Sequence, residues 1–134
     1  MKLFRKFLAP GLFLAVAAEM GPTALLAQTS EAQITGIVKD KSGGVIPGAE
    51  AKIENPAAGV TRLTVTDEEG RYLFRSLPPA VYTLVVNAPR FKTKTVKDLE
   101  LHVAQQARLD IELEVGQPGE TVTVTEVTPL LQAE

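Results

Sequence analysis

The chain has 134 residues with no Cys, no Trp and one His, and its formal net charge is −2. This length suffices for one small domain with a single core. The weakly acidic balance argues against nucleic-acid binding, which relies on clustered Lys and Arg, and the lack of Cys excludes disulfides, thiolate chemistry and lipid attachment through a cysteine.

The N-terminal segment predicts export. Three basic residues within the first six positions precede an apolar run over residues 7–18, which is shorter than the roughly 20 residues that a membrane span requires. We expect a signal peptide at residues 1–27, cleaved after Ala27, with cleavage after Ala18 as the alternative. Removing residues 1–27, with three basic residues and one acidic residue, changes the formal charge from −2 to −4. The mature chain is then expected, without a membrane span, in the periplasm or at the outer membrane.

Short strand-like runs separated by turn signals follow this segment. Residues 33–39 place Ile34 and Val38 on one face, and residues 49–54 alternate apolar and charged side chains until Asn55-Pro56 interrupts them. Such recurrence, about every 8 to 12 residues, is typical of a β-sandwich or barrel.

A turn at residues 67–70 separates the next two predicted strands. Leu63 and Val65 mark the first of these strands, and Tyr72 and Phe74 mark the second. The Asp-Glu-Glu-Gly turn fits a type I turn with Gly in the left-handed conformation, so the two strands are expected to form a β-hairpin.

The C-terminal half continues the pattern. Pro78-Pro79 predicts a corner before a strand at residues 82–88, and the Lys-Thr alternation of residues 92–97 is typical of an edge strand protected against stray pairing. Residues 108–115 alternate apolar and charged side chains and are expected to close the core. Residues 117–134 are expected to form a linker and an extended tail outside the sandwich.

The predicted fold class is therefore all-β, with a single antiparallel Greek-key β-sandwich of about seven strands over residues 28–116. No helix of useful length is predicted after residue 27.

Four motifs within this domain form a specific combination. They are Gly36-Ile37-Val38-Lys39-Asp40, Ile46-Pro47-Gly48-Ala49, Gly70-Arg71-Tyr72-Leu73-Phe74 and Leu77-Pro78-Pro79. Over residues 32–116 the chain resembles the carboxypeptidase regulatory-like family, a transthyretin-like or starch-binding-like sandwich. The family usually has Gly where this chain has Ala80 and Arg90, so either residue costs roughly 1 kcal/mol if its position requires a positive φ.

The tail resembles the segment that follows such a domain in TonB-dependent outer-membrane receptors. The resemblance implies strand addition to a protein partner, either TonB or an outer-membrane barrel, and a plain linker strand is the alternative. The chain has no room for a plug and barrel, so a detached module or a truncated receptor is expected. The candidate strand-addition residues are Glu120, Thr121, Val122, Thr123, Val124 and Thr125.

Catalysis is not expected, nor is a metal or cofactor. A zinc site requires three protein ligands and a Ser-His-Asp triad requires a well-placed His, whereas the only histidine, His102, fits an ordinary strand end. The acidic residues 67–69 are too few for the six to eight oxygen ligands of calcium and fit a solvated turn.

Carbohydrate binding is the alternative function, because starch-binding-like sandwiches present aromatic side chains to sugars. After residue 27 the chain keeps four aromatic residues, Tyr72, Phe74, Tyr82 and Phe91, and strand alternation directs most of them into the core. The sequence therefore favours a non-catalytic, exported structural or interaction module.

Overall fold

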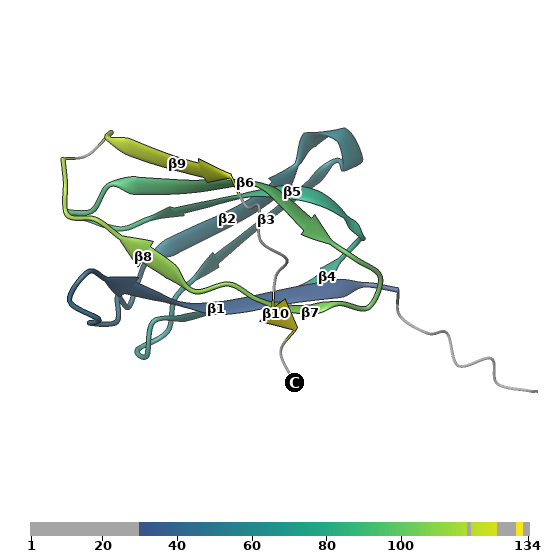
Figure 1. The fold of residues 1–134 in the computed structure, drawn as a ribbon, viewed down its shortest axis with the longest axis horizontal. Helices are drawn as coiled ribbons and strands as arrows, with labels where there is room; N and C mark the ends of the chain where they lie inside the picture. The colour runs from purple at the N-terminus through teal and green to yellow at the C-terminus, as the bar shows by residue number, and fades with distance from the viewer. Residues whose placement is uncertain (1–29, 118, 126–130, 133–134) are drawn as a thin grey trace, which may run out of the picture.

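The computed structural model describes residues 30–117, 119–125 and 131–132 (Figure 1). The predicted signal peptide lies outside these residues. Within them, no helix is long and apolar enough to cross a membrane.

Ten strands and one short 3-10 helix, η1 (Pro56–Ala58), make up the described chain. The strands are β1 (Ala32–Asp40), β2 (Glu50–Asn55), β3 (Val60–Val65), β4 (Arg71–Leu77), β5 (Ala80–Asn87), β6 (Thr93–Leu101), β7 (Gln106–Arg108), β8 (Ile111–Leu113), β9 (Thr121–Thr125) and β10 (Leu131–Gln132).

Two sheets face each other across one apolar core, which confirms the predicted all-β sandwich (Figure 1). The first sheet contains β10, β7, β1 and β4 in that order, with β8 also paired to β1, and the second sheet runs β3-β2-β5-β6-β9. The prediction was about seven strands. The greater number arises because one predicted strand is divided and the tail contributes two more.

Alternating side chains fill the core as predicted. Ile34 and Val38 of β1 are fully buried, and so are Ala51 and Ile53 of β2. A strand directs every second side chain to the same face, so the two sheets meet through their apolar faces.

Gly36 permits a close approach between β1 and the segment that joins β7 to β8, which runs parallel beside it. A Cβ on Gly36 would lie 1.9 Å from the carbonyl oxygen of Leu109. That oxygen accepts a hydrogen bond from the Tyr72 hydroxyl, and the Leu109 N–H donates to the Thr35 carbonyl at 2.8 Å. Burial raises the pKa of Tyr72, so its hydroxyl keeps the proton that it donates.

Three strand pairs are parallel, which departs from the antiparallel arrangement predicted. β7 and β8 both run parallel to β1, and β9 runs parallel to β6. The single strand predicted over residues 108–115 is instead two strands, because the ladder to β1 is interrupted at Leu109 and Asp110. There the Asp110 carboxylate accepts a hydrogen bond from the Ile37 N–H at 3.0 Å and so replaces one backbone link.

The turn at residues 67–70 has the predicted geometry, but the predicted hairpin is wrong. Gly70 has a φ of 72°, and the Asp67 carboxylate accepts hydrogen bonds from the N–H groups of Glu69 in the turn and Arg71 at the start of β4. However, β3 pairs with β2 and β4 pairs with β1, so the turn crosses from one sheet to the other. The buried Thr66 hydroxyl accepts a hydrogen bond from the Ala49 N–H at 2.8 Å, which holds the chain beside β2 before it crosses.

Two β-bulges interrupt the alternation of buried and exposed residues. In β4, Arg75 and Ser76 together oppose one residue of β1, and in β6, Lys97 and Asp98 together oppose one residue of β5. Ser76 and Asp98 have φ values of 55° and 56°, in the left-handed region that is typical of one bulge class. Each bulge exposes two successive side chains and returns the next residue to the core.

The prediction that residues 92–97 form an edge strand is wrong. β5 lies on one side of β6 and β9 lies on the other, paired in register from Thr93 with Thr121 to Lys97 with Thr125. Part of the tail expected outside the sandwich therefore extends the second sheet. The sequence pattern could not indicate this pairing, because alternating Thr and Val suits a linker strand and a sheet strand equally.

We predict that Gly36→Ala destabilises the domain by about 3 kcal/mol, because the added methyl group overlaps the Leu109 carbonyl. Chemical denaturation measures the change in the free energy of unfolding. The control is Ile37→Ala, a truncation of the half-buried neighbour on the other face of β1, and we expect it to cost about 1 kcal/mol or less. Equal losses of unfolding free energy in the two variants would contradict a steric constraint at Gly36.

We predict that Arg90→Gly stabilises the domain by about 1 kcal/mol and raises the melting temperature by about 5 °C. Arg90 has a φ of 71° at the third position of the turn closed by the Phe91 N–H and the Ala88 carbonyl.

Ala80 provides the matched control, since it is the other position where the resembled family has Gly. It lies in β5 and is not among the non-Gly residues with positive φ. We therefore expect Ala80→Gly to lower the melting temperature, and a rise in both variants would show that backbone conformation is not the cause.

Candidate functional site

The predicted strand-addition segment, residues 120–125, lies at the edge of the second sheet. The Thr93 N–H donates to the Glu120 carbonyl at 2.9 Å. In a regular parallel ladder this bond directs the backbone groups of Val122 and Val124 toward β6. The N–H and C=O groups of Thr121, Thr123 and Thr125 then point away from the sheet, and among the described residues no strand pairs with this outer edge.

The side chains of β9 contribute little burial. The three Thr residues are exposed, Val122 is half-buried and Val124 is 38% exposed. Backbone hydrogen bonds therefore hold this strand more than apolar contacts do. Local stability is low where buried apolar contacts are few, so β9 is among the parts of the sandwich that open most easily.

Ion pairs hold the beginning of β9. The Lys92 amine lies 3.6 Å from a carboxylate oxygen of Glu114 and 3.6 Å from one of Glu120. Lys41 approaches Glu114 at 3.2 Å, and this hydrogen bond, followed by its charge, lowers the pKa of the Glu114 carboxyl. All four side chains remain partly exposed to solvent, so the pairs orient the segment and add little stability.

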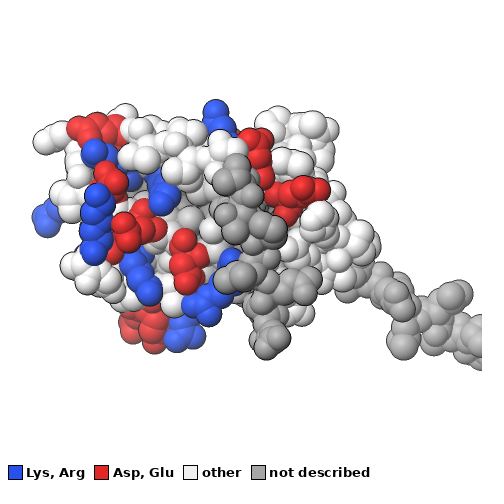
Figure 2. All heavy atoms as spheres, in the orientation of Figure 1, with Lys and Arg blue, Asp and Glu red and all other residues white. Residues whose placement is uncertain are grey.

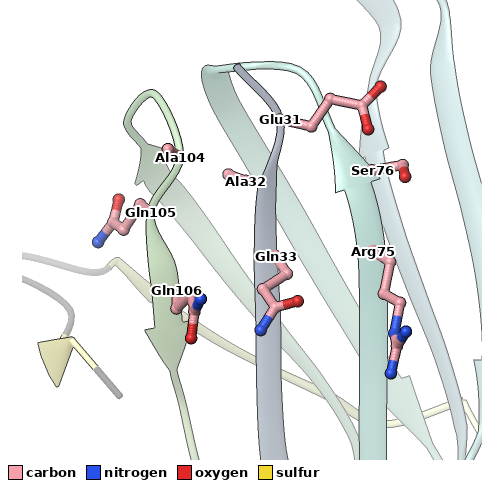
Figure 3. Close-up of a pocket in the computed structure, with 8 residues that line it drawn as sticks. All are labelled: Glu31, Ala32, Gln33, Arg75, Ser76, Ala104, Gln105 and Gln106. Atoms are coloured by element: carbon pink, nitrogen blue, oxygen red, sulfur yellow. The ribbon is translucent and has the colours of Figure 1, made fainter. Parts of the chain in front are cut away.

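A second candidate site is a shallow polar pocket of about 330 Å³ at one end of the first sheet (Figure 3). Gln106, Gln33 and Arg75 stand on the adjacent strands β7, β1 and β4, and Ser76 and Ala104 lie at its other end (Figure 3). Ser76 and Ala104 both have positive φ. Backbone strain of this kind often accompanies binding sites, although here the β4 bulge accounts for Ser76.

This pocket was not predicted from the sequence, because it depends on the β4 bulge. The signal was present, since buried Phe74 and Leu77 are three residues apart, as are buried Val96 and Leu99 in β6. Regular strands place core residues two apart, so a spacing of three marks an extra residue.

The structure does not gather the residues considered for catalysis or metal binding. His102 is exposed, and its Nδ1 lies 3.8 Å from a Glu100 oxygen. Asp67 accepts hydrogen bonds within its own turn, as expected of a solvated turn residue. No group of three or more potential metal ligands occurs in the described part of the chain.

The aromatic residues offer little surface to a sugar. Tyr72, Phe74 and Tyr82 are buried, and Phe91 is half-buried against the core. The Tyr82 hydroxyl also donates to the Pro78 carbonyl, which fixes the corner between β4 and β5. On the face that Figure 2 displays, basic and acidic side chains are interspersed, which is not the pattern of a polyanion-binding surface.

Solved structures share this fold at low sequence identity. The Bacillus anthracis TIE protein matches with a TM-score of 0.53 and 16% identity, over 64% of this chain and 17% of that one. Catechol 1,2-dioxygenase from Pseudomonas arvilla C-1 matches with a TM-score of 0.53 and 14% identity, over 68% of this chain and 54% of that one. A putative carbohydrate binding protein from Bacteroides uniformis matches with a TM-score of 0.50 and 19% identity, over 61% and 40%.

The chain thus spans about a sixth to about half of the length of these three structures, and the likeness concerns the fold alone. No curated protein matches the sequence. The carboxypeptidase regulatory-like domain model matches residues 33–114, which include β1 to β8 except the first residue of β1. The chain therefore belongs to the carboxypeptidase regulatory-like domain family.

Proposed function

We propose that this protein is a non-catalytic, exported β-sandwich module that binds a protein partner by strand addition along the outer edge of β9. One observation carries the proposal: the backbone groups of Thr121, Thr123 and Thr125 face away from β6 and have no strand partner among the described residues. An extended partner segment would pair with these groups and continue the sheet.

The position of β9 favours a mode in which the partner strand pairs with β9 while β9 stays in the sheet, over one in which β9 first detaches. A strand has two hydrogen-bonding edges, and β6 pairs with only one edge of β9. A partner therefore gains hydrogen bonds without first breaking those between β6 and β9. The ladder to β6 already holds β9 extended, which lowers the ordering cost of binding.

The partner that we propose is TonB or an outer-membrane barrel, met in the periplasm or at the outer membrane. This rests on the resemblance of residues 113–132 to the segment before the plug of TonB-dependent receptors, and on the basic and apolar N-terminal segment. The lack of a catalytic function is supported by the exposed position of His102, which lies near Glu100 and, among the described residues, not near a nucleophile, and by the position of Asp67 in a turn.

We predict that the chain binds the periplasmic C-terminal domain of TonB saturably in isothermal titration calorimetry and that Thr123→Pro weakens this binding at least tenfold. Proline removes the outward N–H of Thr123 but leaves the ladder to β6 intact, so the fold should be retained.

Val122→Pro is the matched control, because the N–H of Val122 points toward β6. This change should detach β9 and increase amide hydrogen exchange in β6, whereas Thr123→Pro should not. A flat titration with the wild-type chain would exclude TonB as the partner and leave an outer-membrane barrel. Equal binding by wild type and Thr123→Pro would overturn strand addition at this edge.

Carbohydrate binding is the second candidate, and the polar pocket is the observation that favours it. Gln33, Arg75 and Gln106 could donate and accept hydrogen bonds with sugar hydroxyls. The likeness to the putative carbohydrate binding protein of Bacteroides uniformis adds only the fold. The pocket lacks an aromatic residue, which makes it a weaker candidate than the β9 edge.

We predict flat titrations of the wild-type chain against a glycan panel. Saturable binding that Arg75→Ala abolishes would place a sugar in the pocket, and binding that Phe91→Ala abolishes would place it against the half-buried aromatic ring. Saturable glycan binding of either kind, together with a flat TonB titration, would favour the carbohydrate function over the protein-binding function.

A further inference from the structure

The opposite edge of the second sheet is β3, and no strand of the described residues pairs with its outer side. The backbone groups that point outward from β3 can be assigned. The Thr66 N–H donates to the Ala49 carbonyl at 2.9 Å, and the antiparallel ladder then runs without a shift from the pair of Val65 with Glu50 to that of Val60 with Asn55. Hydrogen-bonded pairs alternate along such a ladder, so Thr64 and Arg62 face β2. The N–H and C=O groups of Thr61, Leu63 and Val65 consequently point outward.

The side chains of the same residues are also exposed. Leu63 is 64% exposed and Val65 is 60% exposed, and they lie two residues apart on the outer face of the sheet. Edge strands are usually protected by Pro, bulges or charges. The first sheet has such protection in β4, where Arg75 belongs to a bulge, but β3 has neither Pro nor a bulge and carries one charge, Arg62.

We propose that two copies of this chain pair through β3 to form a symmetric antiparallel dimer with one continuous sheet. A two-fold axis perpendicular to the sheet keeps outer faces together, so Leu63 lies opposite Leu63 of the second copy, and Thr61 lies opposite Val65 of that copy. This register uses every outward group of Thr61, Leu63 and Val65 and makes six hydrogen bonds.

Neighbouring registers are less favourable. Moving the two-fold axis by one residue slips the two strands by two residues and leaves only four hydrogen bonds in either direction. Toward the N-terminus, the move also places Arg62 opposite Arg62 of the second copy, which is a like-charge contact. In the proposed register Arg62 lies opposite Thr64 instead. The exposed Leu63 and Val65 side chains become contiguous across the axis, which removes apolar surface from water in both copies.

The β3 edge of a second copy is a better partner for β3 than the β9 edge of a second copy. Pairing β3 with β9 is a head-to-tail contact that does not close, so it would produce extended assemblies. The β9 edge presents Thr side chains and offers Leu63 no apolar counterpart. The dimer also leaves β9 free, because β3 and β9 are opposite edges of the sheet.

The first test is sedimentation equilibrium of the full chain, expressed with its own N-terminal segment and purified as the host processes it. We expect a monomer-dimer equilibrium between micromolar and millimolar concentration. Leu63→Pro removes an outward N–H from each copy and should raise the dimer dissociation constant about tenfold or more while the circular dichroism spectrum is retained. Leu63→Lys should do the same by like-charge repulsion, whereas Val81→Lys, at another exposed valine, should not.

The second test reads the register through disulfide formation, since the chain contains no Cys. In Leu63→Cys the two Cα atoms should lie about 5.5 Å apart, within disulfide range, so oxidation should give a covalent dimer. In Val65→Cys the two Cα atoms should lie four residues apart along the strands, about 14 Å, and oxidation should give little covalent dimer.

A monomer at all concentrations, species larger than a dimer, or equal cross-linking of both cysteine variants would overturn the proposal. Because Thr123→Pro leaves β3 unchanged, failure of the TonB titration and failure of dimerisation are separate outcomes.

Discussion

The close contact between Gly36 and the Leu109 carbonyl is the constraint on which the first sheet depends. No side chain fits between them, and the carbonyl accepts its hydrogen bond from the buried Tyr72 hydroxyl of β4. Three segments distant in sequence, β1, β4 and the link from β7 to β8, therefore meet at one point. Because the ladder is interrupted at this contact, β1 has two short parallel partners on one side and one long antiparallel partner on the other.

The two bulges determine how the sheets present their outer faces. Each places two successive polar residues outside and restores the alternation for Leu77 or Leu99, so the core stays continuous while the strands bend. The β4 bulge also contributes Arg75 and Ser76 to the polar pocket and protects that edge of the first sheet. The second sheet has no bulge at β3, and neither of its outer edges, β3 and β9, has a further strand partner in the described part of the chain.

These features make recognition through the backbone more plausible chemically than recognition through side chains. The aromatic residues stabilise the core and the corner at Pro78, and the ion pairs join partly exposed side chains and contribute little energy. Within residues 30–117 and 119–125, the second sheet has two edges with outward backbone groups that no strand pairs with, one lined by Thr and one by Leu63 and Val65. Different side chains on two otherwise similar edges would let one edge bind a partner and the other a second copy without competition.

The sequence alone determined the two-layer β fold, the turn at residues 67–70 and the inward direction of Ile34, Ile53 and Tyr72, because local alternation and turn residues encode these properties. Which strands pair is a property of distant residues, so only the tertiary structure decided that residues 67–70 connect two sheets, that β7 and β8 run parallel to β1 and that β9 covers β6. The candidate segment at residues 120–125 was recognisable from its letters. Its free edge was not, since the direction of each N–H group depends on the register of the neighbouring strand.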